Sequence, residues 1–298
     1  MTAAVQPRQA AMFILGGMAV LGLSDNLVAF ISAQSSLWQF HLIRGGIVLL
    51  ALTVASFFGA GALWPRKPVA VIGRSMFQAG ALLIYFGCIA IMPIGVVIAG
   101  MFTSPLFVVI ISVVFQKRSV GPVRWIAVAI GFSGALLVVR PDPGALDLVA
   151  FLPIFAGLLY AIGAIATRAW CEGEQTLTLT AWFFVMLTVF GIIGVLILPA
   201  GGASGAADFS VRGWMPVTGT MLMWYIALAV GALIGIACIF RGYQLGDASN
   251  VAVFEYALLI FASFWAWALW GQTLAPLGIL GMCLIVGSGL IIALRSEP

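Results

Sequence analysis

Charged residues are scarce in this chain: they make up 7% of its 298 residues, whereas hydrophobic residues make up 63%. Soluble globular domains carry about 25% charged residues, so most of this surface must face lipid rather than water. Because backbone amides cannot stay unsatisfied in hydrocarbon, only helices or a closed barrel can span it. The apolar runs are continuous over about 20 residues, as in a spanning helix, and do not alternate as barrel strands do. The sequence therefore predicts an all-α integral membrane protein.

Residues that carry metal, redox or ATP chemistry are also few. His41 is the single histidine, which argues against a histidine-based metal site. No two of the four cysteines form a CxxC pair, and we interpret them as small buried hydrophobes. No GxxxxGK[ST] motif is present, so direct use of ATP is not expected. We expect no metal, no cofactor and no nucleic-acid partner, and we interpret Met1–Ala11 as a short tail before an uncleaved first span.

Ten apolar runs are separated by Pro- and Gly-containing joints, which are typical helix stops and starts. Each run is long enough, or nearly long enough, to cross a bilayer as a helix. The predicted spans are Met12–Ala33, Trp38–Phe58, Val71–Ile91, Ile94–Phe115, Pro122–Val139, Leu148–Ala169, Thr176–Leu198, Met215–Phe240, Ala248–Trp270 and Pro276–Leu294.

The basic residues indicate the orientation of these spans. If the N-terminus is cytoplasmic, ten basic residues lie in or beside cytoplasmic segments and two lie on the other side, a strong positive-inside bias. We therefore expect both termini in the cytoplasm and a multi-pass protein of the bacterial inner membrane. The ten are Arg8, Arg66, Lys67, Arg74, Lys117, Arg118, Arg124, Arg168, Arg241 and Arg295, and the two are Arg140 and Arg212.

The two halves of the chain resemble each other. Residues 103–140 match residues 257–295 at an offset of 154 to 155, so that Ser133–Gly134 corresponds to Ser288–Gly289 and Arg140 to Arg295. A repeat with an odd number of spans enters the membrane from opposite sides in its two copies. The sequence therefore predicts two inverted five-helix repeats, residues 1–147 and 148–298, an arrangement typical of secondary transporters.

Several short motifs, together with this length and helix number, carry a family resemblance. They are the polar stretch Gly22–Asn26 in the first span, Arg44 early in the second, Pro105 in the fourth, and the glycines Gly131 and Gly134 in the fifth. In these features the chain resembles the drug/metabolite transporter superfamily and its EamA-type repeat, over essentially its whole length. The resemblance implies a ten-helix fold, a central cavity and alternating access. Within the superfamily it points to bacterial exporters of aromatic amino acids.

Ionisable and polar residues inside spans are the strongest candidates for function, because each is costly in lipid unless it faces a cavity or a partner. Glu255 could bind an ammonium group, exchange a proton, or make a structural hydrogen bond. Asp25, flanked by Ser24 and Asn26, could contact substrate or hold helices together. Arg44, with His41 one turn before it, could pair with Asp25, capture a carboxylate, or extend toward the outer surface.

Four aromatic residues are candidates for the cavity walls: Tyr85, Phe102, Tyr160 and Tyr256. Tyrosine offers an apolar face and one hydroxyl, which suits an aromatic or aliphatic substrate group. The resemblance places Tyr85, Phe102 and Tyr160 at aromatic positions of the central cavity. The alternative for each of these residues is a structural role, either in helix packing or in an aromatic belt at the membrane interface.

The functional prediction is a monomeric secondary transporter that exports small organic solutes, most simply aromatic and other neutral amino acids. The alternative is export of other metabolites or cationic drugs, with proton antiport. A membrane-embedded enzyme is disfavoured, because one histidine and scattered acids give no catalytic set. A receptor would normally have seven spans and long signalling loops, and a channel would have selectivity rings built by an oligomer.

Overall fold

The computed structural model describes residues 6–32, 34–89, 94–115, 117, 121–139, 151–200, 209–271 and 276–295. These residues form helices joined by short connections, and no strand occurs among them. The all-helical prediction is confirmed. The helices are α1 Pro7–Ser32, α2 Leu37–Phe57, α3 Pro68–Ile89, α4 Ile94–Met101, α5 Ser104–Val114, α6 Pro122–Val139, α7 Phe151–Ala169, α8 Thr176–Ile197, α9 Gly219–Leu245, α10 Ala248–Val251, the 3₁₀ helix η4 Ala252–Tyr256, α11 Ala257–Trp270 and α12 Pro276–Arg295.

Seven segments within the described ranges are long and apolar enough to cross a membrane. Six of them are α1, α2, α3, α7, α8 and α9, and the seventh is the segment Ala248–Leu269. Three shorter apolar helices, Ser104–Val114, Pro122–Val138 and Pro276–Ile291, complete the set. This pattern is compatible with ten crossings. The expected boundary between the repeats, at residues 147 and 148, lies outside the described residues, as do Arg118 and Arg140.

Helix ends follow the local sequence. Ser36 caps α2 by accepting a hydrogen bond from the Gln39 amide, and Thr218 caps α9 in the same way through the Met221 amide. Gly271 closes α11 with a φ of 65°, a left-handed conformation that glycine adopts without strain. Because Thr218 caps α9, this helix is Gly219–Leu245 and not the predicted Met215–Phe240. Similarly, α1 begins at Pro7, five residues before the predicted Met12.

Two predicted spans depart from a regular α-helix. The first, Ile94–Phe115, divides into α4 and α5 around Phe102 and Thr103, just before Pro105. Pro105 has no amide hydrogen to donate to the Met101 carbonyl, and the Thr103 hydroxyl donates to the Gly100 carbonyl at 2.6 Å. The second, Ala248–Trp270, becomes α10, η4 and α11, with the tight 3₁₀ turn at Glu255 and Tyr256. The predicted limits of both spans agree with the structure to within one residue, whereas the interruptions inside them were not predicted.

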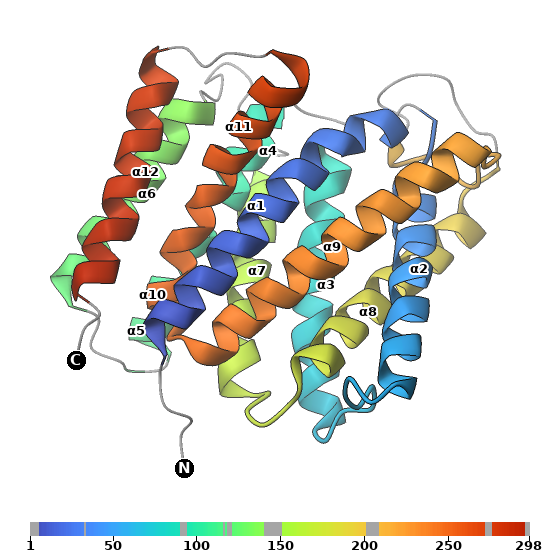
Figure 1. Cartoon of the computed structure of the whole chain (residues 1–298), viewed down its shortest axis with the longest axis horizontal. Helices are drawn as coiled ribbons and strands as arrows, with labels where there is room; N and C mark the ends of the chain where they lie inside the picture. Colours follow the sequence, from blue (N-terminus) through green and yellow to red (C-terminus); the bar gives the residue numbers. More distant parts are fainter. Residues whose placement is uncertain are drawn as a thin grey trace.

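The helices pack in four principal pairs: α1 with α9, α3 with α7, α2 with α8, and α6 with α12. Figure 1 shows α1 lying along α9 through the body of the bundle, and α6 beside α12 at one edge. Small residues allow close approach: a Cβ built at Gly134 of α6 would lie 2.6 Å from the Gly281 carbonyl oxygen of α12. Such contacts are how membrane helices associate without a hydrophobic driving force.

The beginning of α1 and the end of α12 lie at the same end of the bundle (Figure 1). Polar contacts gather near this end. Arg124, at the beginning of α6, forms an ion pair of 3.1 Å with Asp247, and Arg168, at the end of α7, donates to the carbonyls of Gln244 and Gly246. These side chains fix the ends of α6, α7 and α9 relative to one another, and we call this end of the molecule the terminal end.

Candidate functional site

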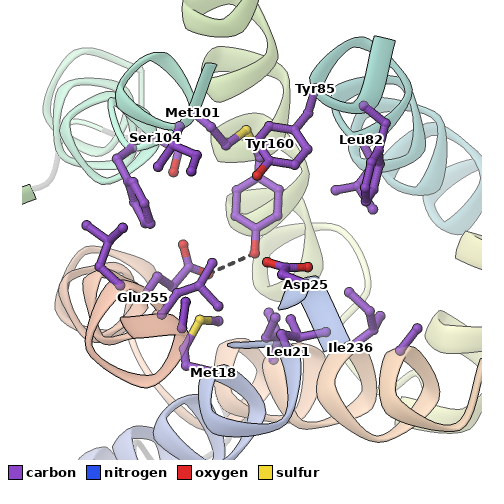
Figure 2. Close-up of a pocket in the computed structure, with 18 of the residues that line it drawn as sticks. Met18, Leu21, Asp25, Leu82, Tyr85, Met101, Ser104, Tyr160, Ile236 and Glu255 are labelled. Atoms are coloured by element: carbon purple, nitrogen blue, oxygen red, sulfur yellow. Dashed lines mark hydrogen bonds between the residues drawn. The ribbon is translucent and has the colours of Figure 1, made fainter. Parts of the chain in front are cut away.

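A cavity of about 520 Å³ lies inside the bundle. It is bordered by α1, α2, α3, α7, α8, α9 and α11, and by the interrupted regions at α4–α5 and η4. Figure 2 shows side chains from these elements converging on it, with Tyr85 and Tyr160 on one side and Met18 and Leu21 on the other. The lining includes Met18, Leu21, Asp25, Asn26, Arg44, Leu82, Tyr85, Phe86, Met101, Phe102, Ser104, Tyr160, Phe183, Phe184, Ile236, Glu255, Leu258 and Ser263.

Glu255 is the acidic group that the 3₁₀ turn presents to this cavity. Its side chain is almost completely buried, with 5% of its surface exposed. The Tyr160 hydroxyl of α7 donates a hydrogen bond of 2.9 Å to Glu255 Oε1, drawn in Figure 2. A carboxyl group this deep in an apolar bundle needs such donors, because desolvation is costly. The break between α10 and α11 therefore positions Glu255 toward α7 and the cavity.

Asp25 and Arg44 bring opposite charges to the same cavity from α1 and α2. Arg44 is buried, and its guanidinium lies 4.3 Å from the ring centroid of Phe40 and 5.7 Å from that of Phe86. Its Nη2 is 3.3 Å from His41 Nδ1. These contacts hold the guanidinium in place as a cation–π group. Arg44 thus faces the cavity interior rather than the outer surface.

Aromatic rings form a large part of the wall. Tyr85 and Phe86, neighbours on α3, lie edge to face with centroids 5.3 Å apart. Phe102, from the break after α4, packs on Tyr256 with centroids 5.7 Å apart. With Tyr160, these residues give the cavity apolar faces together with tyrosine hydroxyls, a combination suited to a flat ligand with a polar edge.

Of the ten candidates from the sequence, seven line the cavity: Asp25, Asn26, Arg44, Tyr85, Phe102, Tyr160 and Glu255. The other three, Ser24, His41 and Tyr256, do not. Ser24 donates to the Val20 carbonyl at 3.1 Å and packs on Gly231 of α9. His41 lies behind Arg44 among Phe40 and Phe86, and the Tyr256 hydroxyl donates to the Phe102 carbonyl at 3.2 Å. They support the wall from behind.

Asn26 has two roles. It lines the cavity, and its Nδ2 donates to the Gly22 carbonyl at 2.8 Å and to the Ala262 carbonyl at 3.1 Å, which ties α1 to α11. Trp265 reinforces this contact by donating from its indole nitrogen to the Ala19 carbonyl at 3.1 Å. The amide donors of Asn26 are therefore used within the protein.

Sequence reasoning missed the apolar part of the lining. Phe86, Phe183 and Phe184 line the cavity but lie in largely apolar runs. No polarity pattern separates a cavity-facing phenylalanine from a lipid-facing one. Ser104 and Ser263 could have been found, since each is a polar residue inside a predicted span.

The overall fold agrees with a known crystal structure over 98% of each chain, with a TM-score of 0.76 and 16% sequence identity. A riboflavin transporter of Rhizobium johnstonii is 29% identical over 272 residues, which cover 91% of this chain and 83% of that protein. A pseudopaline exporter of Pseudomonas aeruginosa is 26% identical over 232 residues, or 76% of each chain. Residues 147–294 match the EamA-like transporter family.

These similarities and the apolar helices define a multi-pass membrane transporter of small molecules. Residues 147–294 carry an EamA-like domain of the drug/metabolite transporter superfamily, and the similarity to transporters extends over 76% to 91% of the chain. The family resemblance noted from the motifs of the sequence is confirmed.

Proposed function

We propose that this protein is a secondary transporter of a planar heteroaromatic metabolite of flavin size, with riboflavin as the first substrate to test. The observation that carries the proposal is a cavity of about 520 Å³ walled by Tyr85, Phe86, Phe102 and Tyr160. Pockets that bury drug-sized ligands are about 300–1,000 Å³, mostly apolar, with a few polar groups. A flat tricyclic ring fits such walls. The similarity to a riboflavin transporter over 91% of the chain supports this choice.

The polar groups suit the remaining parts of such a ligand. Asp25 and Arg44 approach from α1 and α2, whereas Glu255 and Tyr160 approach from η4 and α7. Carboxylates accept hydrogen bonds from ring N–H and hydroxyl groups, and a guanidinium donates to carbonyl oxygens. A flavin carries ring N–H, hydroxyl and carbonyl groups on a neutral molecule. The cavity can therefore bind it without burying a charge of the ligand.

A second candidate is an amino acid with an aromatic or other neutral side chain, exported as the sequence suggested. Arg44 on one side and Glu255 on another are specific support for it, because a zwitterion needs a cation for its carboxylate and an anion for its ammonium. Export of a cationic drug in exchange for protons would use Glu255 and Asp25, but Arg44 on the same cavity opposes a cation.

We further propose that the molecule consists of two inverted five-helix repeats, residues 1–147 and 148–298, that rock about the cavity. The helix pairs support this. In the two proposed repeats α1 corresponds to α7, α2 to α8, α3 to α9 and α6 to α12. Under this correspondence the α1–α9 pair becomes the α7–α3 pair, which is also observed, and the pairs α2–α8 and α6–α12 are each formed by two equivalent helices. The two helix breaks also correspond, since Phe102 and Tyr256 are related by the repeat offset of 154. Inverted repeats with discontinuous helices at the site are typical of alternating access.

The proposed location is a bacterial inner membrane, with both chain ends in the cytoplasm and the protein acting as a monomer. The positive-inside bias supports the orientation, and the terminal end gathers Arg124 and Arg168. A cysteine placed beside Arg8 and another beside Arg295 should both react with an impermeant thiol reagent from the cytoplasmic side. Reaction from opposite sides would contradict the orientation.

Counterflow in liposomes tests the function. Purified protein, loaded in turn with unlabelled riboflavin, phenylalanine, tryptophan or a cationic dye, is given the same labelled compound outside, with and without a proton gradient. Counterflow does not depend on the direction of net transport. We expect labelled riboflavin to accumulate above protein-free liposomes. Accumulation of amino acids alone would favour the second candidate, and accumulation of none would reject both.

A further inference from the structure

The cavity-facing stripe of α3 continues as polar residues toward the terminal end. Leu82 and Tyr85 line the cavity. Gln78 lies one helical turn before Leu82, and Arg74 one turn before Gln78, on the same face because residues four apart lie above one another. Both side chains are completely buried or nearly so, at 1% and 0% exposure. Burying an arginine and a glutamine inside a membrane helix costs free energy, so we expect these side chains to have a functional or structural role.

The facing stripe of α7 continues in the same direction. Tyr160 lines the cavity. Gly163, three residues further, has no side chain where Gln78 packs against it, and Thr167, four residues beyond that, accepts a hydrogen bond of 2.9 Å from Arg74 Nε. The α3 and α7 faces that form the cavity therefore meet below it along a polar seam, made of Gln78 and Arg74 against Gly163 and Thr167.

Two aromatic side chains, Phe183 and Phe240, lie between this seam and the cavity. Phe183 of α8 lines the cavity and also packs edge to face on Phe240 of α9, with centroids 5.5 Å apart. The Arg74 guanidinium lies 3.6 Å from the centroid of Phe240. Arg74 Nη1 donates to the Leu179 carbonyl of α8 at 3.1 Å. The rings of Phe183 and Phe240 thus lie between the cavity lining and Arg74 on this side.

Several hydrogen-bonding groups of the seam have no partner within the described part of the protein. Four buried polar atoms on three α3 residues have no hydrogen-bond partner among the described residues: Arg74 Nη2, Ser75 Oγ, Gln78 Nε2 and Gln78 Oε1. Buried polar groups in native proteins are rarely left without partners. A partner from outside the protein reaches this depth only if α3 and α7 separate. Seven buried side-chain atoms have no partner within the described part of the chain, and four of them lie on this one stretch of α3.

We propose that Arg74, Ser75 and Gln78 form a second, inner substrate site, exposed when the transporter opens toward the terminal end. Guanidinium, carboxamide and hydroxyl groups together suit a ligand with hydrogen-bond-accepting oxygens, namely carbonyl or carboxylate groups. In the closed seam Arg74 is bound to α7 and α8. On opening, its donors and those of Gln78 transfer to the substrate that leaves the cavity. The inference rests on the proposed transport function.

Thiol accessibility tests the path without needing a known substrate. In a variant with all four native cysteines replaced by alanine, Ser75→Cys and Gln78→Cys are each exposed to an impermeant maleimide, in vesicles of either orientation. Val128→Cys is the matched control, because Val128 is fully buried in α6 away from the seam. We expect labelling of residues 75 and 78 from the terminal side, about tenfold faster than at residue 128, because a transiently populated open state exposes them. Labelling no faster than the control, or from the opposite side only, would overturn the proposal.

Gln78→Leu tests the binding role. The change removes two unpaired buried atoms without adding volume, so a structural role predicts an equal or higher melting temperature and unchanged transport. The proposed role predicts the same stability and unchanged binding from the cavity side, but counterflow of riboflavin reduced about tenfold, as expected for a lost hydrogen bond to substrate. Full counterflow in Gln78→Leu would reject the site. If the wild-type protein moves no riboflavin, the proposed substrate fails, and the labelling experiment still decides whether the seam opens.

Discussion

The hydroxyl of Tyr160 donates to Oε1 of Glu255 across 95 positions of the chain, and the bond lies on the wall of the central cavity. It joins α7 to the 3₁₀ turn that interrupts the helix before α11. The bond therefore couples the shape of the cavity to a point where the backbone already departs from α-helix. Discontinuous helices at a mid-membrane site are where transporter folds place ligand contacts.

Tyr160→Phe should test this coupling. The change keeps the ring as a wall and removes one donor, so the buried Glu255 carboxyl loses a partner at a cost of about 1–3 kcal/mol. We expect substrate affinity or transport to fall about tenfold while the fold is kept. A double-mutant cycle with Glu255→Met, which removes the acceptor at similar volume, isolates the interaction. If the two effects simply add, the hydrogen bond has no role in the site.

Glu255→Gln should distinguish the two candidate substrates. The amide keeps an acceptor for Tyr160 but has no negative charge. A neutral flavin should bind within about threefold of the wild-type affinity, whereas a zwitterionic amino acid, deprived of the partner of its ammonium, should bind at least about tenfold more weakly. Titration of purified protein with both ligands measures the ratio. Equal losses for the two would leave Glu255 without a role in charge recognition.

Arg44→Lys should destabilise the protein although the charge is kept. The lysine cannot stack its head group on Phe40 as the planar guanidinium does, and it cannot reproduce the fixed contact with His41. A loss of about 0.5–2 kcal/mol follows from the cation–π interaction alone. Thermal unfolding in detergent measures it. Arg241→Lys, at an exposed position of α9, is the control and should leave the melting temperature unchanged.

Gly134→Ala should separate α6 from α12. An added Cβ would meet the Gly281 carbonyl oxygen at 2.6 Å, a backbone atom that cannot move aside as a side chain can. Overpacking of this kind costs about 1–3 kcal/mol. Gly287→Ala on α12 is the control, since nothing lies within 4 Å of its added Cβ and alanine favours helix by about 1 kcal/mol. The two variants should shift the melting temperature in opposite directions, and equal shifts would argue against a tight α6–α12 contact.

Composition and apolar runs were enough to predict an all-helical membrane protein and most helix limits to within a few residues. They failed at Thr103 and at Glu255, where a span breaks. At the first, Pro105 and the polar Thr103 were visible in the sequence, but proline is tolerated within many membrane helices. At the second, the run Ala252–Leu259 contains no glycine or proline, so we attribute the 3₁₀ turn to tertiary packing against α1, α5, α6 and α12.

The candidate site was partly predictable for a related reason. Asp25, Arg44 and Glu255 stood out because charge is rare in a span. Their direction could not be read from the sequence, since a helix with apolar residues on every side has no polar face to orient it. For the same reason the position predicted for Arg74 was wrong. We counted it among basic residues at the cytoplasmic boundary, but α3 begins at Pro68, and Arg74 lies inside the bundle with no exposed surface.

The most direct test of the account is whether the cavity itself binds a flavin. Stacking on aromatic side chains quenches flavin fluorescence, so riboflavin is titrated with purified wild-type protein, with Leu82→Trp, which fills the cavity, and with Leu50→Trp, which adds the same bulk at a position 67% exposed on α2. The account predicts saturable quenching by the wild-type protein and Leu50→Trp, and its loss in Leu82→Trp. Saturable quenching that survives in Leu82→Trp, or that never occurs with the wild-type protein, would contradict it.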